Sequence, residues 1–139
     1  MSDQLIRMEH TDGGQRPYIA ATIHNGVVYP CGQVPVDSSG MTPDELSEQV
    51  RLCIDNLERV LVSAGSSLDS LLQLTVYLAD IGDLDEYNQA YLGRMAGKTL
   101  PPRTTVQAAA FRGAKRIELT ATAAVAGTPS TTTGVDHAS

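Results

Sequence analysis

Residues 42–78 read TPDELSEQVRLCIDNLERVLVSAGSSLDSLLQLTVYL and carry two hydrophobic periods in succession. In the first part, apolar residues recur at helical spacing, namely Leu46, Val50, Cys53, Ile54, Leu57, Val60, Leu61 and Ala64. This spacing forms one apolar stripe, so the sequence predicts an amphipathic helix over 42–64. Thr42 is expected to cap the helix in a capping box with Glu45, and Gly65 is expected to end it.

Period-two patterns predict the strands. The strongest lies in 72–78, where apolar residues, namely Leu72, Leu74, Val76 and Leu78, alternate with Gln, Thr and Tyr. Further strands are expected at 5–9, 18–24, 27–32, 104–109 and 117–125. Asn25-Gly26 is the expected hairpin turn between 18–24 and 27–32, because both residues tolerate a left-handed backbone.

A second, shorter helix is expected to begin at Asp83. Its buried face is marked by Leu84, Tyr87, Tyr91 and Met95. The element order is then β-β-β-α-β-α-β-β, which predicts an α+β fold with one mixed sheet and two helices packed on one face. The other face of that sheet would carry many small and apolar groups, which points to oligomerisation.

Length and composition are those of a single globular domain. The chain has 139 residues, of which 42% are hydrophobic and 19% charged, and this is enough for one core. We expect one domain over 1–126. Residues 127–139 are rich in Thr, Ser, Gly and Pro, so we expect a disordered C-terminal tail there.

Charge and cysteine usage limit the partners and the compartment. The formal net charge is −6, and no run of Lys or Arg appears, so nucleic acid is not an expected partner. Cys31 and Cys53 lie too far apart for a metal or redox motif and are expected to be reduced. No stretch resembles a signal peptide or a membrane span, so we expect a soluble, cytoplasmic protein with no membrane partner.

Most standard catalytic motifs are absent from the sequence. It contains no Gly-rich phosphate loop, no HExxH and no paired Cys motif. Its three histidines, His10, His24 and His137, are scattered, which gives no support to a Ser-His-Asp triad. We therefore expect no metal and no cofactor.

Two charged residues stand out against their surroundings. Arg103 follows two prolines and opens an otherwise uncharged strand, while Glu118 lies in a strand whose following residues carry no charge. A charge in such a strand either faces solvent or is held against a partner. The pattern alone leaves three alternatives open, namely two exposed residues, a structural ion pair between them, or a functional site.

Four segments carry a resemblance to a known family. They are PY at 17–18, CGQVPV at 31–36, LPPR at 100–103 and IEL at 117–119. In this order and spacing they resemble the RidA/YjgF (reactive intermediate deaminase) family, also named endoribonuclease L-PSP. The likeness covers about residues 15–126.

The resemblance implies a chorismate-mutase-like fold and a barrel-like homotrimer with a site in each cleft between subunits. It also implies deamination of enamines and imines, such as 2-aminoacrylate and its imino tautomer, to a 2-keto acid and ammonia. Arg103 matches the arginine that clamps the substrate carboxylate, and Glu118 matches the acid that positions the attacking water. The two are expected on one wall of the cleft, with Tyr18, Cys31 and Gly32 on the neighbour's wall.

The chain departs from the family pattern at positions of this site. Cys31 stands where Ser or Thr is common, and a thiol is a weaker hydrogen-bond partner than a hydroxyl. Thr105 stands where many members have Cys, and that substrate-binding position contributes largely through its backbone. Thr120 replaces an acid of some relatives, which leaves Glu118 as the only carboxylate on its strand.

Other functions stay open at this point. One is a specialised catabolic deaminase resembling 2-aminomuconate deaminase, with a pocket shaped by Tyr29, Cys31 and Phe111. Another is a non-catalytic module that binds a small carboxylate through Arg103 and does not need Glu118. Ribonuclease activity is the least favoured, because the chain is acidic and has no His pair for phosphodiester chemistry.

Overall fold

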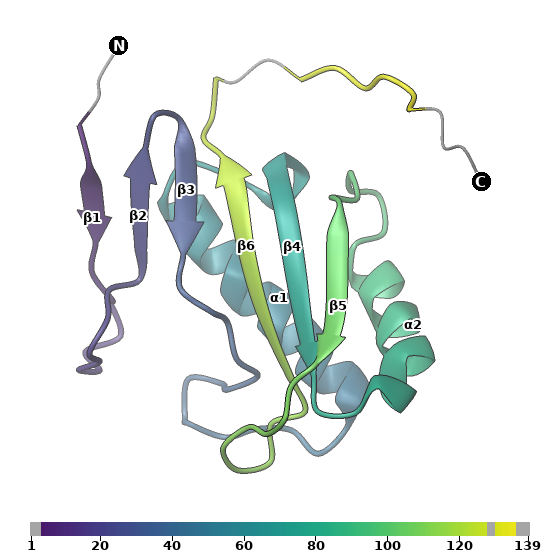
Figure 1. Ribbon diagram of the computed structural model, residues 1–139. Helices are drawn as coiled ribbons and strands as arrows, with labels where there is room; N and C mark the ends of the chain where they lie inside the picture. Colours follow the sequence, from purple (N-terminus) through teal and green to yellow (C-terminus); the bar gives the residue numbers. More distant parts are fainter. Residues whose placement is uncertain (1–3, 128–129, 136–139) are drawn as a thin grey trace.

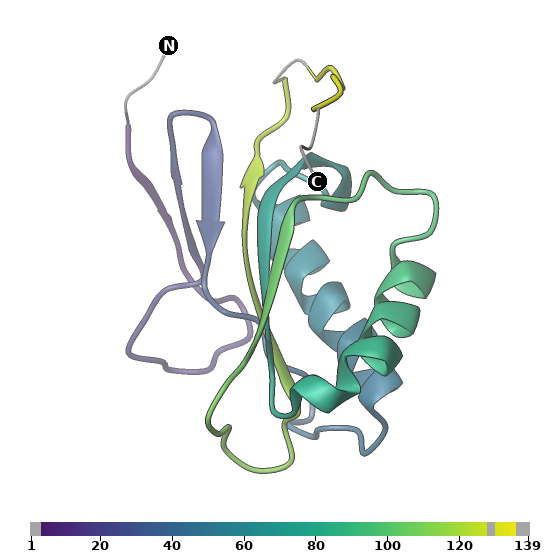
Figure 2. The same ribbon diagram turned by 45° about the vertical axis from the view of Figure 1, so that its right-hand side comes forward.

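The computed structural model describes residues 4–127 and 130–135 and contains one mixed sheet with two helices (Figure 1). The strands are β1 (Ile6–Met8), β2 (Ala21–His24), β3 (Val27–Pro30), β4 (Leu71–Leu78), β5 (Arg103–Gln107) and β6 (Ile117–Ala124). Their spatial order is β1-β2-β3-β6-β4-β5, and only β4 and β5 are parallel neighbours. Helices α1 (Leu46–Ser63) and α2 (Leu84–Arg94) lie on the same side of the sheet, as Figure 2 shows.

The predicted α+β class, the element order and the placement of both helices on one face are confirmed. Two short 3₁₀ turns, Leu68–Ser70 and Ile81–Asp83, were not predicted and precede β4 and α2. Of the expected tail, residues 130–135 form neither helix nor strand, while 128–129 and 136–139 lie outside the described residues.

The Asn25-Gly26 hairpin is confirmed. Both residues have a positive φ, 51° and 78°, as a tight turn between two twisted strands requires. The turn closes β2 onto β3, so that His24 pairs with Val27 and Ala21 with Pro30. These strands are shorter than predicted, since β2 begins at Ala21 and β3 ends at Pro30.

The apolar stripe of α1 packs on the sheet and forms most of the core. Its fully buried members are Leu46, Val50, Cys53, Ile54, Leu57 and Leu61, while Val60 and Ala64 are partly buried. Alternate residues of β6, from Ile117 to Ala123, pack against them. The predicted stripe and the predicted period of β6 are therefore confirmed.

The predicted start of α1 is wrong, whereas its end is confirmed. The helix begins at Leu46 with Glu45 at the N-cap position, and no side chain caps it. Thr42 lies in the loop before the helix, and the carbonyl of the next residue, Pro43, accepts a hydrogen bond from the Gln49 side chain at 2.7 Å. At the other end Gly65 has a φ of 81°, and the N–H of the following residue returns to the Leu61 carbonyl.

The predicted burial of Leu72 is also wrong. A β-bulge interrupts the pairing of β4 with β6 between Leu71 and Gln73. Because an extra residue in one strand shifts the alternation of its side chains, Leu71 packs on the core and Leu72 is 46% exposed. The remaining alternation, from Leu74 to Leu78, follows the prediction.

Two polar side chains of α1 position the loops near the lower end of the sheet in Figure 1. Gln49 is fully buried; its amide nitrogen donates to the carbonyls of Pro43 and Ala114, and its oxygen accepts from the Arg116 N–H at 2.8 Å. Asn56 donates to the carbonyls of Val34 and Val36, at 2.9 and 3.1 Å. These bonds tie the 31–45 and 108–116 loops to the helix.

We expect Gln49→Leu to lower the free energy of unfolding by about 1–3 kcal/mol, because similar volume is kept while buried backbone partners are left unpaired. Urea unfolding monitored by circular dichroism measures this difference. Gln89→Leu, the same change at an exposed position of α2, is the control and should be close to neutral. Equal stability of the two variants would contradict a structural role for the Gln49 amide.

Candidate functional site

Glu118 lies on the face of the sheet that the helices do not cover. Its neighbours along β6, Ile117 and Leu119, are fully buried toward α1, so alternation turns Glu118 to the opposite face beside its pairing partner Tyr77. Glu118 is partly buried and makes no hydrogen bond or ion pair with any residue that the structure describes. It is thus a carboxylate held in place without a counter-charge.

Gly32 lies directly against this carboxylate. A Cβ added at Gly32 would be 3.3 Å from the Glu118 Cδ and would collide with its Oε2. A side chain at position 32 would therefore displace the Glu118 carboxylate from its present position. Within the described chain the Gly32 N–H donates to no acceptor, whereas the next N–H, that of Gln33, bonds to the Leu119 carbonyl at 2.8 Å. The site thus offers a backbone donor next to a carboxylate.

Cys31 and Tyr18 lie near the same end of the β2–β3 hairpin, because the first residue of β2, Ala21, pairs with the last residue of β3, Pro30. The Cys31 N–H donates to the carbonyl of Ala20, two residues after Tyr18, at 2.8 Å. Tyr18 is 54% exposed, and the His10 ring packs on its ring and bonds to its backbone carbonyl. Burial raises the pKa of the Cys31 thiol, which keeps it protonated and unsuited to nucleophilic attack at neutral pH.

A hollow adjoins these residues where β3 and β6 separate. The two strands pair only at Val27 and Val28, and the chain returns to β6 at the Gln33–Leu119 bridge. The hollow has a volume of about 240 Å³ and is lined by Tyr29, Pro30, Gln73, Thr75, Thr120, Ala121 and Thr122. It offers hydroxyl groups on the uncovered face of the sheet.

Arg103 and Thr105 lie on the edge strand β5 and face the helices. Arg103 pairs with the buried Leu74, and its guanidinium carbon is 5.1 and 5.0 Å from the ring centres of Tyr87 and Tyr91 of α2. It makes no ion pair with a carboxylate of the described residues. The Thr105 hydroxyl is buried and has no hydrogen-bond partner there.

The structure thus separates the predicted site residues into two groups. Gly32 and Glu118 are in contact beside the gap between β3 and β6, with Cys31 just after β3 and Tyr18 just before β2. Arg103 and its neighbour Thr105 lie on β5, two strands away from β6, on the opposite face. A structural ion pair between Arg103 and Glu118 within one chain is therefore wrong. The expectation that these two share a wall is also wrong, because Glu118 packs on Gly32 of its own chain.

Sequence reasoning missed the role of Tyr87 and Tyr91 in this geometry. It placed both on the buried face of α2, and both are buried, but it did not connect them with Arg103. Their rings stack at 5.6 Å with an interplanar angle of 23°. Two tyrosines four residues apart on a helix are a usable signal, since such residues project from the same face.

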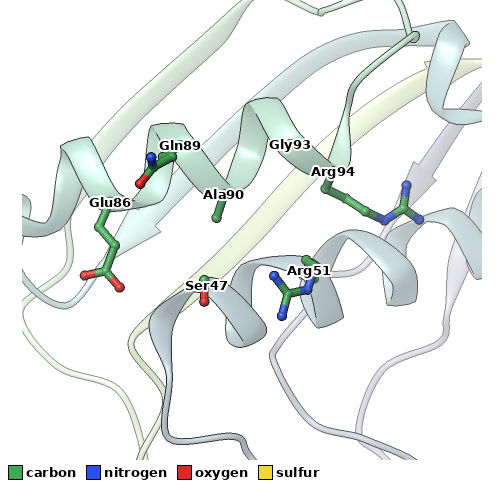
Figure 3. Close-up of a pocket in the computed structure, with 7 residues that line it drawn as sticks. All are labelled: Ser47, Arg51, Glu86, Gln89, Ala90, Gly93 and Arg94. Carbon is green, nitrogen blue, oxygen red and sulfur yellow. The ribbon is translucent and has the colours of Figure 1, made fainter.

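A second hollow, of about 540 Å³, lies between the two helices and contains none of the predicted site residues (Figure 3). Ser47 and Arg51 of α1 face Glu86, Gln89 and Ala90 of α2 across it, with Gly93 and Arg94 further along. Arg94 bonds to Asp55 and Glu58 at 2.8 Å each and so joins the helices. This hollow is a seam between helices that is bridged by ion pairs.

Over residues 4–127 and 130–135, no group of three or more His, Cys, Asp or Glu side chains is placed to hold a metal ion. In the same residues no helix has the length and apolar character needed to cross a membrane.

A family model, relatives of known name and solved structures all resemble this chain. The family model for Endoribonuclease L-PSP matches residues 12–125. The 2-iminobutanoate/2-iminopropanoate deaminase of Rattus norvegicus is 36% identical over 120 residues, which is 85% of each chain. Protein mmf2, mitochondrial, of Schizosaccharomyces pombe is 39% identical over 92 residues, 66% of this chain and 72% of mmf2. The crystal structure of E. coli TdcF with bound serine has a TM-score of 0.79 at 27% identity and covers 86% of this chain and 98% of TdcF.

Proposed function

This chain belongs to the Endoribonuclease L-PSP family, also named RidA/YjgF, and on that premise we propose that it is an enamine/imine deaminase. Its substrates are 2-imino or 2-enamino acids such as 2-aminoacrylate, which tautomerises to 2-iminopropanoate. Water adds to the imine carbon, the C–N bond breaks, and the products are a 2-keto acid and ammonia. The reaction requires a carboxylate clamp and a group that takes a proton from water and returns it to nitrogen.

Arg103 and Glu118 suit these two tasks chemically. The planar guanidinium donates two parallel hydrogen bonds to a carboxylate. Glu118 orients the attacking water, accepts its proton as the C–O bond forms, and passes a proton to the departing nitrogen. Gly32 contributes a backbone N–H, and Tyr18, Cys31 and Thr105 line the site.

One observation carries this proposal. Two partly buried groups of opposite charge, Arg103 and Glu118, are both held by neutral neighbours rather than by counter-ions within the described chain. Removing a charge from water without pairing it is unfavourable, so such charges are concentrated at functional sites. A substrate that carries a carboxylate and needs a base would use both.

The separation of Arg103 from Glu118 supports a site shared between subunits. In a homotrimeric ring, each interface joins one surface of a subunit to a different surface of the next. We propose that one wall carries Arg103 and Thr105, and that the other carries Glu118, Gly32, Cys31 and Tyr18. This replaces the wall assignment expected from the sequence.

The proposed function is tested by generating 2-aminoacrylate in the presence of the protein and measuring release of pyruvate and ammonia above the spontaneous rate. Binding of pyruvate without acceleration would favour the carboxylate-binding module instead. Faster turnover of an aminomuconate-type substrate would favour the specialised catabolic deaminase, and cleavage of RNA alone would restore the ribonuclease alternative. The cytoplasmic location stays a prediction, since mmf2 is named as mitochondrial.

The shared site makes a quantitative prediction for mixed trimers. When equal amounts of inactive Arg103→Ala and Glu118→Gln chains are refolded together, about a quarter of the interfaces should combine two intact walls and recover activity in proportion. Activity and native mass spectrometry are measured on the same mixture.

The matched control is a mixture of Glu118→Gln with Gly32→Val, two changes on the same wall. It should recover no activity, because neither chain supplies an intact copy of that wall. Confirmed mixing without recovery in the Arg103→Ala and Glu118→Gln pair would contradict the shared site.

A further inference from the structure

Arg103 rests on an aromatic ledge formed by Tyr87 and Tyr91. The guanidinium carbon is almost equidistant from the two ring centres, at 5.1 and 5.0 Å. Both rings are fixed, with Tyr87 0% and Tyr91 3% exposed, and they stack on each other. A cation at this distance from two buried rings is attracted by both. The aromatic ledge therefore restricts where the Arg103 side chain can lie.

Unlike Arg103, several arginines of the described chain are held by ion pairs with carboxylates. Arg16 is paired with Asp12, Arg94 with Asp55 and Glu58, and Arg116 with Asp83, all at 2.7 to 2.9 Å. Each carboxylate fixes its arginine but also neutralises it. The aromatic ledge fixes Arg103 without contributing a negative charge.

The ledge cannot become an anion near neutral pH. Burial raises the pKa of both Tyr87 and Tyr91, and for both the nearby Arg103 charge acts in the opposite direction without reversing the shift. Neutral phenols leave the guanidinium charge uncompensated, so it is available to an anionic ligand.

Unpaired polar atoms are concentrated around this arginine. In the described chain, the buried side-chain oxygens without a hydrogen-bond partner are those of Tyr87, Asn88, Tyr91 and Thr105. All four belong to α2 or β5, the two elements that meet at Arg103. Buried polar atoms are nearly always paired in folded proteins, so a group of exceptions indicates a place adapted to something other than stability.

We propose that Tyr87 and Tyr91 are positioning residues, whose rings hold Arg103 in place to bind a carboxylate while leaving its charge unpaired. The inference rests on the proposed function for the identity of the ligand, a 2-imino acid or its 2-keto acid product. We assign this role to the tyrosine rings, because the guanidinium lies over both ring centres. The phenylalanine variants separate the rings from the Tyr87 hydroxyl, which also interacts with Arg103.

The test compares Tyr87→Leu and Tyr91→Leu with Tyr87→Phe and Tyr91→Phe by calorimetric titration with pyruvate. We expect each leucine variant to raise the Kd for pyruvate by on the order of 2- to 30-fold, the range of one cation–π contact, and each phenylalanine variant to stay near wild type. In turnover, KM should rise in the leucine variants while kcat is retained. Circular dichroism and native mass verify folding and assembly.

A second measurement separates positioning from general damage to the fold. In an Arg103→Ala background, the leucine changes should have no further effect on pyruvate binding, because the residue they position is gone. The inference would be overturned if the leucine variants bound pyruvate like wild type. It would also be overturned if the leucine changes lowered pyruvate affinity as much in the Arg103→Ala background as in wild type, or if the wild-type protein did not bind pyruvate. If pyruvate binding is lowered in the leucine variants as expected but the protein does not hydrolyse imines, the proposed function would be contradicted and the positioning role of the tyrosines would stand.

Discussion

Glu118→Gln is expected to fold and assemble like wild type and to bind pyruvate, yet to lose about 10²–10⁴-fold in kcat, the usual contribution of a positioned general base. The amide has the size of the carboxylate but cannot accept a proton from water. Because Glu118 makes no hydrogen bond or ion pair with the described residues, the change removes no contact from the fold. Steady-state hydrolysis of 2-aminoacrylate measures the loss.

The matched control is Glu48→Gln, the same chemical change at an exposed position on α1. It should retain full turnover, since Glu48 is remote from the gap between β3 and β6. Wild-type turnover in Glu118→Gln would remove this residue from the mechanism and would favour a binding module.

Arg103→Lys is expected to be almost as damaging as Arg103→Ala. Lysine keeps the charge but cannot donate two parallel hydrogen bonds, and its ammonium lacks the flat surface that stacks on the aromatic ledge. Losing charge-assisted hydrogen bonds to the substrate carboxylate should cost about 10- to 150-fold in kcat/KM, corresponding to about 1.5–3 kcal/mol.

Arg51→Lys, at an exposed position in the seam between the helices, is the control and should not change kcat/KM. If Arg103→Lys keeps near-normal kcat/KM while Arg103→Ala does not, charge alone suffices and the bidentate clamp is wrong.

Local physical chemistry was sufficient to predict most elements. The stripe of α1, the glycine at its end and the Asn25-Gly26 turn depend on interactions between residues a few positions apart, so they are visible in the sequence. The start of α1 was missed because Gln49 ties the segment before the helix to the 108–116 loop, which is distant in the sequence: it bonds to the carbonyls of Pro43 and Ala114 and to the Arg116 N–H. The bulge at Leu72 was missed because it depends on pairing with β6.

For the site, the sequence by itself determined which residues to examine. The sequence singles out Arg103 and Glu118 as charges in otherwise uncharged stretches and by their match to a family pattern. Both are partly buried without a counter-ion in the described chain. The sequence also placed Tyr87 and Tyr91 on one helix face. It could not show that Arg103 lies against that face.

Only the tertiary structure decided how these residues are grouped. An alternating pattern indicates which residues of one strand share a face. To know which residues of different strands lie together, the order and register of the strands are also needed. Here β6 lies between β3 and β4, with β5 parallel to β4 at the edge. This order places Glu118 beside Gly32 on the uncovered face and Arg103 on the aromatic ledge on the other. Long-range pairing of strands, which no local pattern encodes, thus separates the two charges and leaves each without a counter-ion in the described chain.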